Sequence, residues 1–289
     1  MEGKPPVSPR TDDPIAFPGA PGAHSERAIR TIFGPDPETL PSPGFTDVAD
    51  AVLSGRARMG ILPMEITLAG NLSEAYDALG HERITVLAEV AIPVKHSLVG
   101  LPAAQVDGLT KVLSHPIALA QCQRFFRENP TLEASATWDA GGAARKVAER
   151  GDPRLAALAP PEAAEVYGLR VLAKDLQDRV QAQARYFLIG RTGEPPPSLP
   201  GAGGEQTALV VEIADRPGSL VAVLTPFARH GVNLGRIQAR PSPETGGYRF
   251  FLELDAGASG GATAKAIQET RALARELRIL GSYPSWKAE

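Results

Sequence analysis

The residues best suited to chemistry in this chain are those that could hold an anion. Arg185 lies in an apolar segment, ARYFLIG, where a guanidinium can form two parallel hydrogen bonds to a carboxylate. The turn at Gly19–Ser25 is rich in glycine, which lets backbone N–H groups approach a ligand. Ser114 and His115 precede Pro116, where a helix N-terminus would offer further N–H groups. The alternatives are structural: Arg185 would form an ordinary salt bridge, and His115 would cap or pack a helix.

Composition limits the class of protein. Hydrophobic residues make up 43% of the chain and charged residues 22%, which is typical of globular proteins. The length of 289 residues suits two or three domains. The net charge of −3 gives no reason to expect a nucleic-acid surface. The one cysteine, Cys122, excludes an intramolecular disulfide and a multi-cysteine metal site. There is no GxGxxG, HExxH or Walker motif, so no cofactor or metal is indicated.

Neither a membrane span nor an export signal is indicated. The sequence has no apolar run of ~18 residues. The segment MEGKPPVSPRTDD has no apolar core of the kind a signal peptide needs, and we expect residues 1–13 to be a disordered tail. We therefore expect a cytoplasmic protein that does not bind membranes.

Short apolar runs alternate with helical patterns before residue 192. Ala118, Cys122, Phe125 and Phe126 would share one face of a single helix, with Ser114 as its N-cap. The alternation predicts an α/β fold with mostly parallel strands, in which ligands bind at the carboxyl ends of the strands. The predicted strands are 59–63, 84–92, 111–113, 155–159 and 186–190.

The second part of the chain follows a break in regular structure and has a clear order of elements. In TGEPPPSLPGAGGE (192–205) eight of fourteen residues are proline or glycine, which predicts a linker. After it, strands are predicted at 207–214, 234–240, 248–254 and 277–284, and helices at 218–230 and 263–276. This βαββαβ order is that of a ferredoxin-like unit.

Together these segments resemble prephenate dehydratases that carry a C-terminal ACT regulatory domain. The resemblance runs from Ile15 to about Tyr283 and includes FPGAPGAHSERA, GILPMEITLAGNL, IPVKHSLVG, VLSHPIALAQCQRFF, WDAGGAARKVA, AALAPPEAAEVYGL, ARYFLIG, DRPGSLV and NLGRIQARP. It implies a two-lobed catalytic part like a periplasmic binding protein at 14–191. One lobe would hold about 14–92 plus 179–191 and the other about 93–178. The ACT domain would occupy 206–289.

The resemblance also implies an activity and a set of site residues. The family removes carbon dioxide and water from prephenate to give phenylpyruvate in phenylalanine biosynthesis, without a cofactor and under allosteric control by phenylalanine. The implied catalytic residues are Arg185, Thr67, Ser114 and His115. The implied substrate-binding residues are Gly22, Ala23, Ser25, Glu65, Gly70, Ala184 and Tyr186. The implied effector-binding residues are Pro217, Gly218, Ser219, Leu220, Val221, Asn233 and Arg240. We also expect a homodimer or homotetramer, because an exposed sheet edge favours pairing.

Several positions depart from the family pattern. Its Thr-Arg-Phe reads Ala184-Arg185-Tyr186 here, and alanine cannot donate a proton or hydrogen bond to a departing hydroxyl. The family's Glu-Asn-Ser, Asp-Thr and Ala-Ser read Glu65-Ile66-Thr67, Asp139-Ala140 and Ala159-Pro160. Loss of one oriented donor typically lowers a rate by ~10²–10³.

Two main alternatives follow from these departures. In the first, another group donates a proton or hydrogen bond to the departing hydroxyl, and the possible donors are Thr67, Ser114, His24, His115 and Tyr186. In the second, the chain is an altered paralogue that senses an aromatic amino acid or ligand. A solute-binding protein of similar shape is a third reading, and the ACT segment alone could serve only for assembly.

Overall fold

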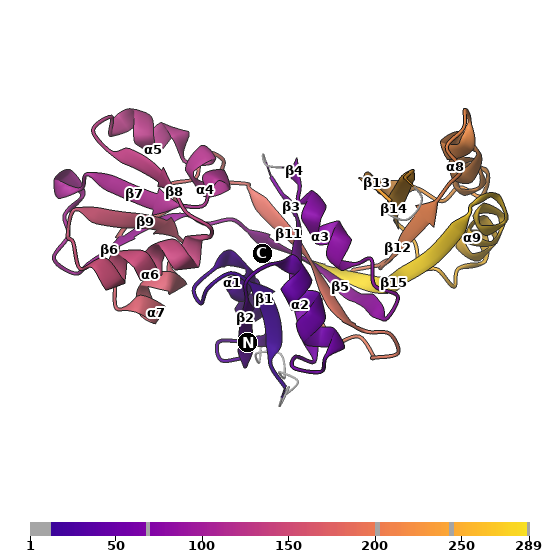
Figure 1. Cartoon of the computed structure of the whole chain (residues 1–289), viewed down its shortest axis with the longest axis horizontal. Coiled ribbons are helices and arrows are strands. Elements are labelled where there is room, and N and C mark those ends of the chain that lie inside the picture. The colour runs from indigo at the N-terminus through magenta and orange to yellow at the C-terminus, as the bar shows by residue number, and fades with distance from the viewer. Residues whose placement is uncertain (1–12, 68–69, 200–202, 243–245, 288–289) are drawn as a thin grey trace, which may run out of the picture. The chain divides into compact units, whose positions relative to one another are not determined.

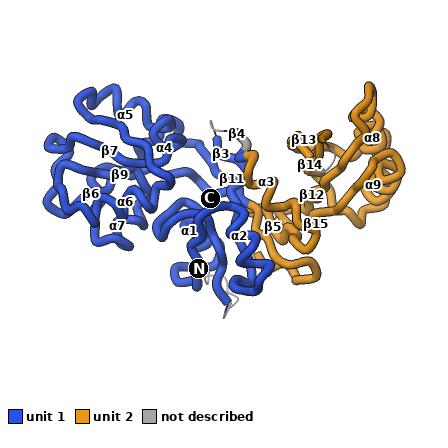
Figure 2. Tube along the Cα trace, in the orientation of Figure 1, with its two compact units in different colours: residues 1–72, 91–186, 288–289 blue, residues 73–90, 187–287 orange. Residues whose placement is uncertain are grey.

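The computed structural model describes residues 13–67, 70–199, 203–242 and 246–287 (Figure 1). Apart from Asp13, the predicted tail lies outside these residues. The described chain packs into two compact units (Figure 2). The N-terminal unit contains the segments up to residue 72 and 91–186, and the C-terminal unit contains 73–90 and 187–287. No helix in the described segments is long and apolar enough to cross a membrane.

The first lobe of the N-terminal unit is built on a small parallel sheet. Its central strand is β1 (Ile15–Pro18), which pairs in parallel with β2 (Thr39–Ser42) and β3 (Met59–Ile66). Ile15, Ala16 and Phe17 are fully buried, so this short apolar run forms the centre of the core. Two helices, α1 (His24–Phe33) and α2 (Phe45–Leu53), follow β1 and β2, and β4 (Gly70–Asn71) pairs antiparallel with the end of β3.

The second lobe of the same unit is a five-stranded sheet with helices on both faces (Figure 1). Its order is β10 (Arg170–Ala173), β6 (Ser97–Gly100), β9 (Leu155–Ala159), β7 (Lys111–Ser114) and β8 (Glu133–Ala136). Because side chains alternate along a strand, one face packs on α6 (Ala140–Arg150) and α7 (Glu162–Tyr167). The other face packs on α4 (Pro116–Ala120), α5 (Gln123–Glu128) and the 3₁₀ turn Val106–Gly108.

The α/β class is confirmed, with a mixed rather than uniform strand direction. The pairs β1–β2, β1–β3, β7–β8 and β7–β9 are parallel. In contrast, β6 pairs antiparallel with both β9 and β10. The prediction of parallel strands is therefore right for the strands joined by helical crossovers.

The prediction of a single helix around Ala118 is wrong. The chain forms α4 and α5 instead, and Cys122 between them has φ −121° and ψ 33°, outside the helical region. The N-cap is His115 rather than Ser114, and its Nδ1 accepts a hydrogen bond from the Ile117 N–H at 3.2 Å. The residue before a proline avoids helical angles, so the cap must directly precede Pro116. A helix of five residues with this cap does not provide the predicted anion site.

The C-terminal unit contains the predicted βαββαβ order. Its elements are β12 (Glu205–Glu212), α8 (Ser219–Arg229), β13 (Leu234–Pro241), β14 (Tyr248–Leu254), α9 (Gly261–Leu273) and β15 (Glu276–Lys287). The antiparallel sheet order β13-β14-β12-β15 is that of a ferredoxin-like fold. Leu209, Val223 and Phe227 belong to one buried cluster that joins the sheet to both helices.

Three further elements belong wholly or partly to this C-terminal unit. They are α3 (Ser73–Ala78), most of β5 (Ile84–Pro93) and the second half of β11 (Gln183–Arg191). The Tyr76 and Phe251 ring centroids lie 5.1 Å apart, and Thr85 donates to the Leu280 carbonyl at 2.7 Å. By packing, residues 73–90 and 187–191 thus group with the C-terminal sheet, whereas the sequence predicted them in the first lobe. Residues 192–199 of the predicted linker form no helix or strand.

Candidate active site

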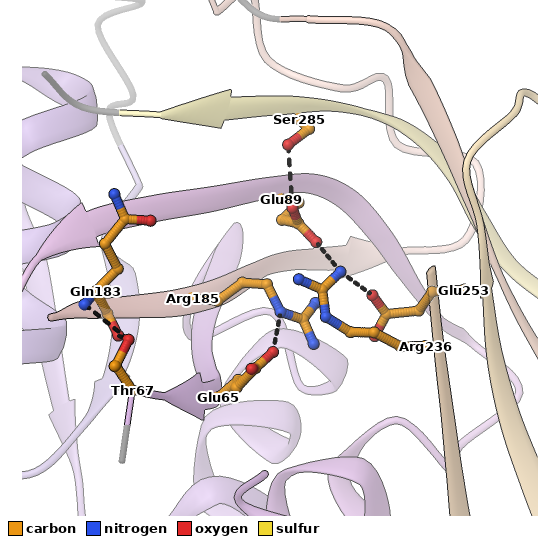
Figure 3. A network of polar contacts seen from close by, with 8 residues as sticks. All are labelled: Glu65, Thr67, Glu89, Gln183, Arg185, Arg236, Glu253 and Ser285. Carbon is orange, nitrogen blue, oxygen red and sulfur yellow. Dashed lines mark hydrogen bonds and ion pairs between the residues drawn. The ribbon is translucent and has the colours of Figure 1, made fainter. Parts of the chain in front are cut away.

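Four polar residues line one side of two neighbouring strands in the N-terminal unit (Figure 3). Glu65 and Thr67 lie at the end of β3, and Gln183 and Arg185 begin β11. The Arg185 Nε donates to Glu65 Oε2 at 3.3 Å, and Arg185 is only 5% exposed. The Thr67 hydroxyl donates to the Gln183 carbonyl and accepts from the Gln183 N–H, both at 3.0 Å. Three predicted site residues are therefore brought together.

Ala184 and Tyr186 point away from Arg185, because alternate residues of a strand face opposite sides. Both side chains are buried. Burial raises the pKa of Tyr186 far above its usual value, although Arg27 and a hydrogen bond with Ser25 act in the opposite direction. Tyr186 therefore remains a protonated phenol, and it connects β11 to the first turn of α1.

The turn before α1 is held from both lobes of the N-terminal unit. The Gly22 N–H donates to Glu26 Oε2 at 2.5 Å, and the Ala20 N–H donates to Asp139 Oδ1 at 3.3 Å. Gly22 has φ +79°, and a Cβ at this position would lie 2.9 Å from the Ala163 Cα. The two lobes are thus closed on this turn. Ala23, the N-cap residue of α1, and Ser25 in its first turn are both buried here.

A chain of polar groups crosses between the lobes. The Gln121 Nε2 donates to the Thr67 carbonyl at 2.8 Å, and Gln121 Oε1 lies 2.7 Å from His96 Nε2. The other nitrogen of that ring, Nδ1, lies 3.2 Å from His24 Nε2. The backbone N–H of His96 also donates to Gln177 Oε1 at 3.0 Å.

The sequence alone predicts little of this polar chain. His24 is one of five possible donors in the sequence analysis, and no role is predicted for His96 or Gln121. The available signal was a polar residue within each of the apolar motifs IPVKHSLVG and VLSHPIALAQCQRFF. Their partners could not be seen, because they lie 25 to 81 residues away along the chain.

The histidines of this region are poor bases in the structure. Burial lowers the pKa of His96, against a smaller opposing effect of its hydrogen bond to Gln121. For His24, burial lowers the pKa well below its usual value, and His96, Arg27 and His115 lower it further. Burial also lowers the pKa of His115, although Asp139 opposes the effect. All three rings are therefore neutral near pH 7.

The remaining predicted site residues are placed as follows. Ser114 is fully buried at the end of β7, and its hydroxyl donates to the Leu158 carbonyl at 2.6 Å. His115, which follows it, is only partly buried. Gly70 begins β4 opposite Ile66, with φ +76° and no atom within 4 Å of an added Cβ. Among the described residues, no group of three or more histidine, cysteine, aspartate or glutamate residues could hold a metal ion.

The C-terminal unit has a pocket of about 230 Å³ between the end of β12 and the start of α8. Four predicted effector residues, Gly218 to Val221, line this pocket. Gly218 has φ +84°, a left-handed conformation that favours glycine at the start of the helix. The other lining residues are Ile213, Ala214, Asp215, Arg216, Tyr248 and Phe250.

The other three predicted effector residues are not among those that line the pocket. Pro217 only adjoins it in sequence. The Asn233 amide donates to Asp255 Oδ2, and Arg240 forms an ion pair with Asp77 of α3, with Nε 3.1 Å from Oδ1. In the same unit, Glu89 contacts Ser285 at 3.0 Å and Arg236 at 3.8 Å (Figure 3).

The chain thus combines two closed α/β lobes that hold a buried arginine with a ferredoxin-like domain that has a pocket of its own. A sequence model of the family described as prephenate dehydratase matches residues 15–194, and one described as ACT domain matches 207–272. The chain belongs to the prephenate dehydratase family, with an ACT domain at its C-terminal end. This confirms the family and fold class predicted from the sequence.

Individual relatives agree with this assignment. The Arabidopsis thaliana protein named arogenate dehydratase/prephenate dehydratase 2, chloroplastic, is 32% identical over 93% of this chain and 72% of its own length. The structure of prephenate dehydratase from Arthrobacter aurescens in complex with L-Phe is 28% identical, with a TM-score of 0.85, covering 93% of this chain and 89% of that one. The structure of GqqA, described as a novel type of quorum quenching acylase, is 30% identical with a TM-score of 0.84, covering 94% and 97%.

Proposed function

We propose that this protein catalyses the decarboxylating dehydration of prephenate to phenylpyruvate and that phenylalanine regulates it. The observation that carries the proposal is the buried Arg185, held by Glu65 in a unit whose two lobes are closed on each other. A buried guanidinium forms strong hydrogen bonds of fixed geometry to a carboxylate, and this supports a role for Arg185 in binding a small anion.

The chemistry asks little of the protein beyond binding and proton supply. As the substrate carboxylate leaves as carbon dioxide, its bonding electron pair enters the ring, and the hydroxyl leaves as water after taking a proton. We assign Arg185 to a substrate carboxylate. The turn containing Gly22, Ala23 and Ser25, which both lobes hold, would enclose the ligand. The substrate roles of Glu65, Thr67 and Gly70 remain predictions from the family resemblance.

Acyl hydrolysis, the activity class given for GqqA, receives less support from the described residues. Such a reaction needs an activated nucleophile. The Ser114 hydroxyl donates a hydrogen bond to the Leu158 carbonyl and not to a histidine that could act as its base. Burial raises the pKa of the Cys122 thiol to about 12, which keeps it protonated and unreactive. We therefore favour dehydration.

For the effector, we propose the pocket at the start of α8. The first N–H groups of a helix favour a carboxylate, and Asp215 could accept hydrogen bonds from an amino group. The Arthrobacter aurescens relative in complex with L-Phe supports phenylalanine as the ligand class.

We also propose that the protein is a homodimer or homotetramer. β13 lies at the edge of the C-terminal sheet, and Ile237 on this strand and Tyr248 on β14 are 46% and 54% exposed. An apolar sheet edge is commonly covered by a second copy. Sedimentation velocity would give the assembly mass, and a concentration-independent monomer would contradict the proposal. The cytoplasmic location remains a prediction.

The activity is tested by steady-state kinetics with prephenate and arogenate as separate substrates. We expect phenylpyruvate from prephenate at a rate that saturates with substrate. The Ala184→Thr variant reports on the altered motif: a gain of tenfold or more would show that the missing hydroxyl limits the rate. An inactive parent and an inactive variant would instead favour the altered paralogue that senses a ligand.

A further inference from the structure

The polar chain between the lobes fixes the tautomers of two histidines. The Thr67 carbonyl can only accept a hydrogen bond, so the Gln121 amide must donate to it and present Oε1 to His96. His96 therefore carries its proton on Nε2, and its neutral Nδ1 is an acceptor. Because His24 Nε2 faces that Nδ1 at 3.2 Å, His24 must donate from Nε2. The Nδ1 of His24 is left as the position that can gain or lose a proton.

The hydrogen bonds and positions of the other possible proton donors make them less suited to protonate the departing hydroxyl. The Thr67 and Ser114 hydroxyls donate hydrogen bonds to the backbone carbonyls of Gln183 and Leu158, at 3.0 and 2.6 Å. Tyr186 is a buried phenol whose hydroxyl is hydrogen-bonded with Ser25. His115 accepts the Ile117 N–H on Nδ1, so this neutral ring keeps its one proton on Nε2 and would become an anion by losing it.

We propose that His24 is the proton donor for the departing hydroxyl, from Nδ1, with His96 and Gln121 as positioning residues; this rests on the proposed function. In the reaction, the bond between the ring and the carboxylate breaks and its electron pair forms a ring double bond. The bond between the ring and the hydroxyl breaks, and the oxygen takes the His24 proton to leave as water. Prephenate dianion plus one proton thus gives phenylpyruvate monoanion, carbon dioxide and water, and solvent returns the proton to His24.

The charges around His24 make its protonation depend on the substrate. Arg27 of the same helix, His96 after β5 and His115 before α4 all disfavour the imidazolium ion, and Arg27 is itself paired with Glu162 of α7 at 3.1 Å. In the empty site these groups and burial keep the ring neutral. A bound dianion supplies the opposite charge and raises the pKa of His24, so substrate binding is accompanied by proton uptake.

The test compares His24→Gln with the parent protein. Glutamine can still donate to His96 Nδ1 but cannot ionise. We expect kcat to fall by about 100-fold or more, the usual contribution of a general acid, with the affinity for phenylpyruvate unchanged. The fall in kcat/KM of the parent protein as the pH rises through the lowered pKa of His24 should be absent in the variant. His81→Gln, at an exposed residue of the C-terminal unit, is the matched control and should keep parental kinetics.

Three outcomes would overturn the proposal. An active parent with a His24→Gln rate within fivefold would remove His24 as donor and leave the proposed function intact. An inactive parent would refute both. Nitrogen-15 NMR of the histidine rings of the parent protein gives a reading that does not depend on activity or on the variant's folding. We expect neutral His24 and His96 both protonated on Nε2, and a proton on Nδ1 of neutral His24 would contradict the assignment.

Discussion

Replacing Gly22 with alanine is the sharpest test of whether the two lobes are closed as described. The new Cβ would lie 2.9 Å from both the Cα and the Cβ of Ala163 in α7, and the first of these is backbone that cannot rotate away. Gly22 also has φ +79°, which L side chains rarely adopt. Gly151→Ala is a matched control, because Gly151 has φ +62° but no atom within 4 Å of an added Cβ.

Backbone strain and overpacking against Ala163 make separate contributions to the loss of stability. A left-handed backbone angle costs an alanine roughly 1–2 kcal/mol, and this cost applies to both variants. Overpacking of a closed contact costs about 1–3 kcal/mol more, which applies to Gly22→Ala alone. The lower entropy of the unfolded alanine chain offsets a similar part of the loss in each variant. Gly22→Ala should therefore lower the free energy of unfolding by about 1–3 kcal/mol more than Gly151→Ala.

Urea unfolding followed by far-UV circular dichroism measures this difference. A second reading is the affinity for phenylpyruvate, which should weaken in Gly22→Ala and stay at the parental value in Gly151→Ala. If the two variants lose the same free energy of unfolding to within about 0.5 kcal/mol, the lobes do not pack together at this turn.

Three other predictions concern the arginine, the buried histidines and the effector pocket. Arg185→Ala should weaken the calorimetric affinity for phenylpyruvate by about 2–4 kcal/mol, and an unchanged affinity in the folded variant would remove Arg185 from the site. Burial lowers the pKa of His24 and His96, so the unfolded chain binds protons more readily than the folded one once the pH falls below about 6.5. As the pH falls further, the free energy of unfolding should decrease by up to about 1.4 kcal/mol per pH unit for each ring. This decrease should be smaller in His24→Gln, which has one such ring fewer. An equal decrease in the two proteins would contradict the lowered pKa of His24. Gly218→Val places a branched side chain at φ +84° in the wall of the pocket and should abolish phenylalanine binding with basal activity retained, whereas parental titration curves would place the effector elsewhere.

Local patterns in the sequence were sufficient for much of the fold. The βαββαβ order after residue 205 could be predicted because its strands contain short apolar runs and most of the turns between its elements carry glycine or proline. The predicted strand at 248–254 agrees with β14 residue for residue. The helix around Ala118 was predicted incorrectly because its apolar spacing continues through Cys122, while the backbone does not.

The candidate site could be predicted only in part. The motifs predict Arg185, Glu65 and Thr67, and β3 and β11 place these three residues on one face. The chain through His24 and His96 was not found, because it depends on two lobes closing on each other rather than on neighbouring residues. The grouping of α3 with the C-terminal sheet was missed for the same reason: the contact of Tyr76 with Phe251 joins residues far apart in the sequence.

The most direct test of the central claim is a simultaneous measurement of phenylpyruvate and carbon dioxide formed from prephenate by the purified full chain. The proposed function predicts the two products in equal amounts, at a rate proportional to protein concentration, and a strong loss of both in Arg185→Ala. Product formation no faster than in the absence of protein, with the fold intact, would contradict the claim that this chain is a dehydratase.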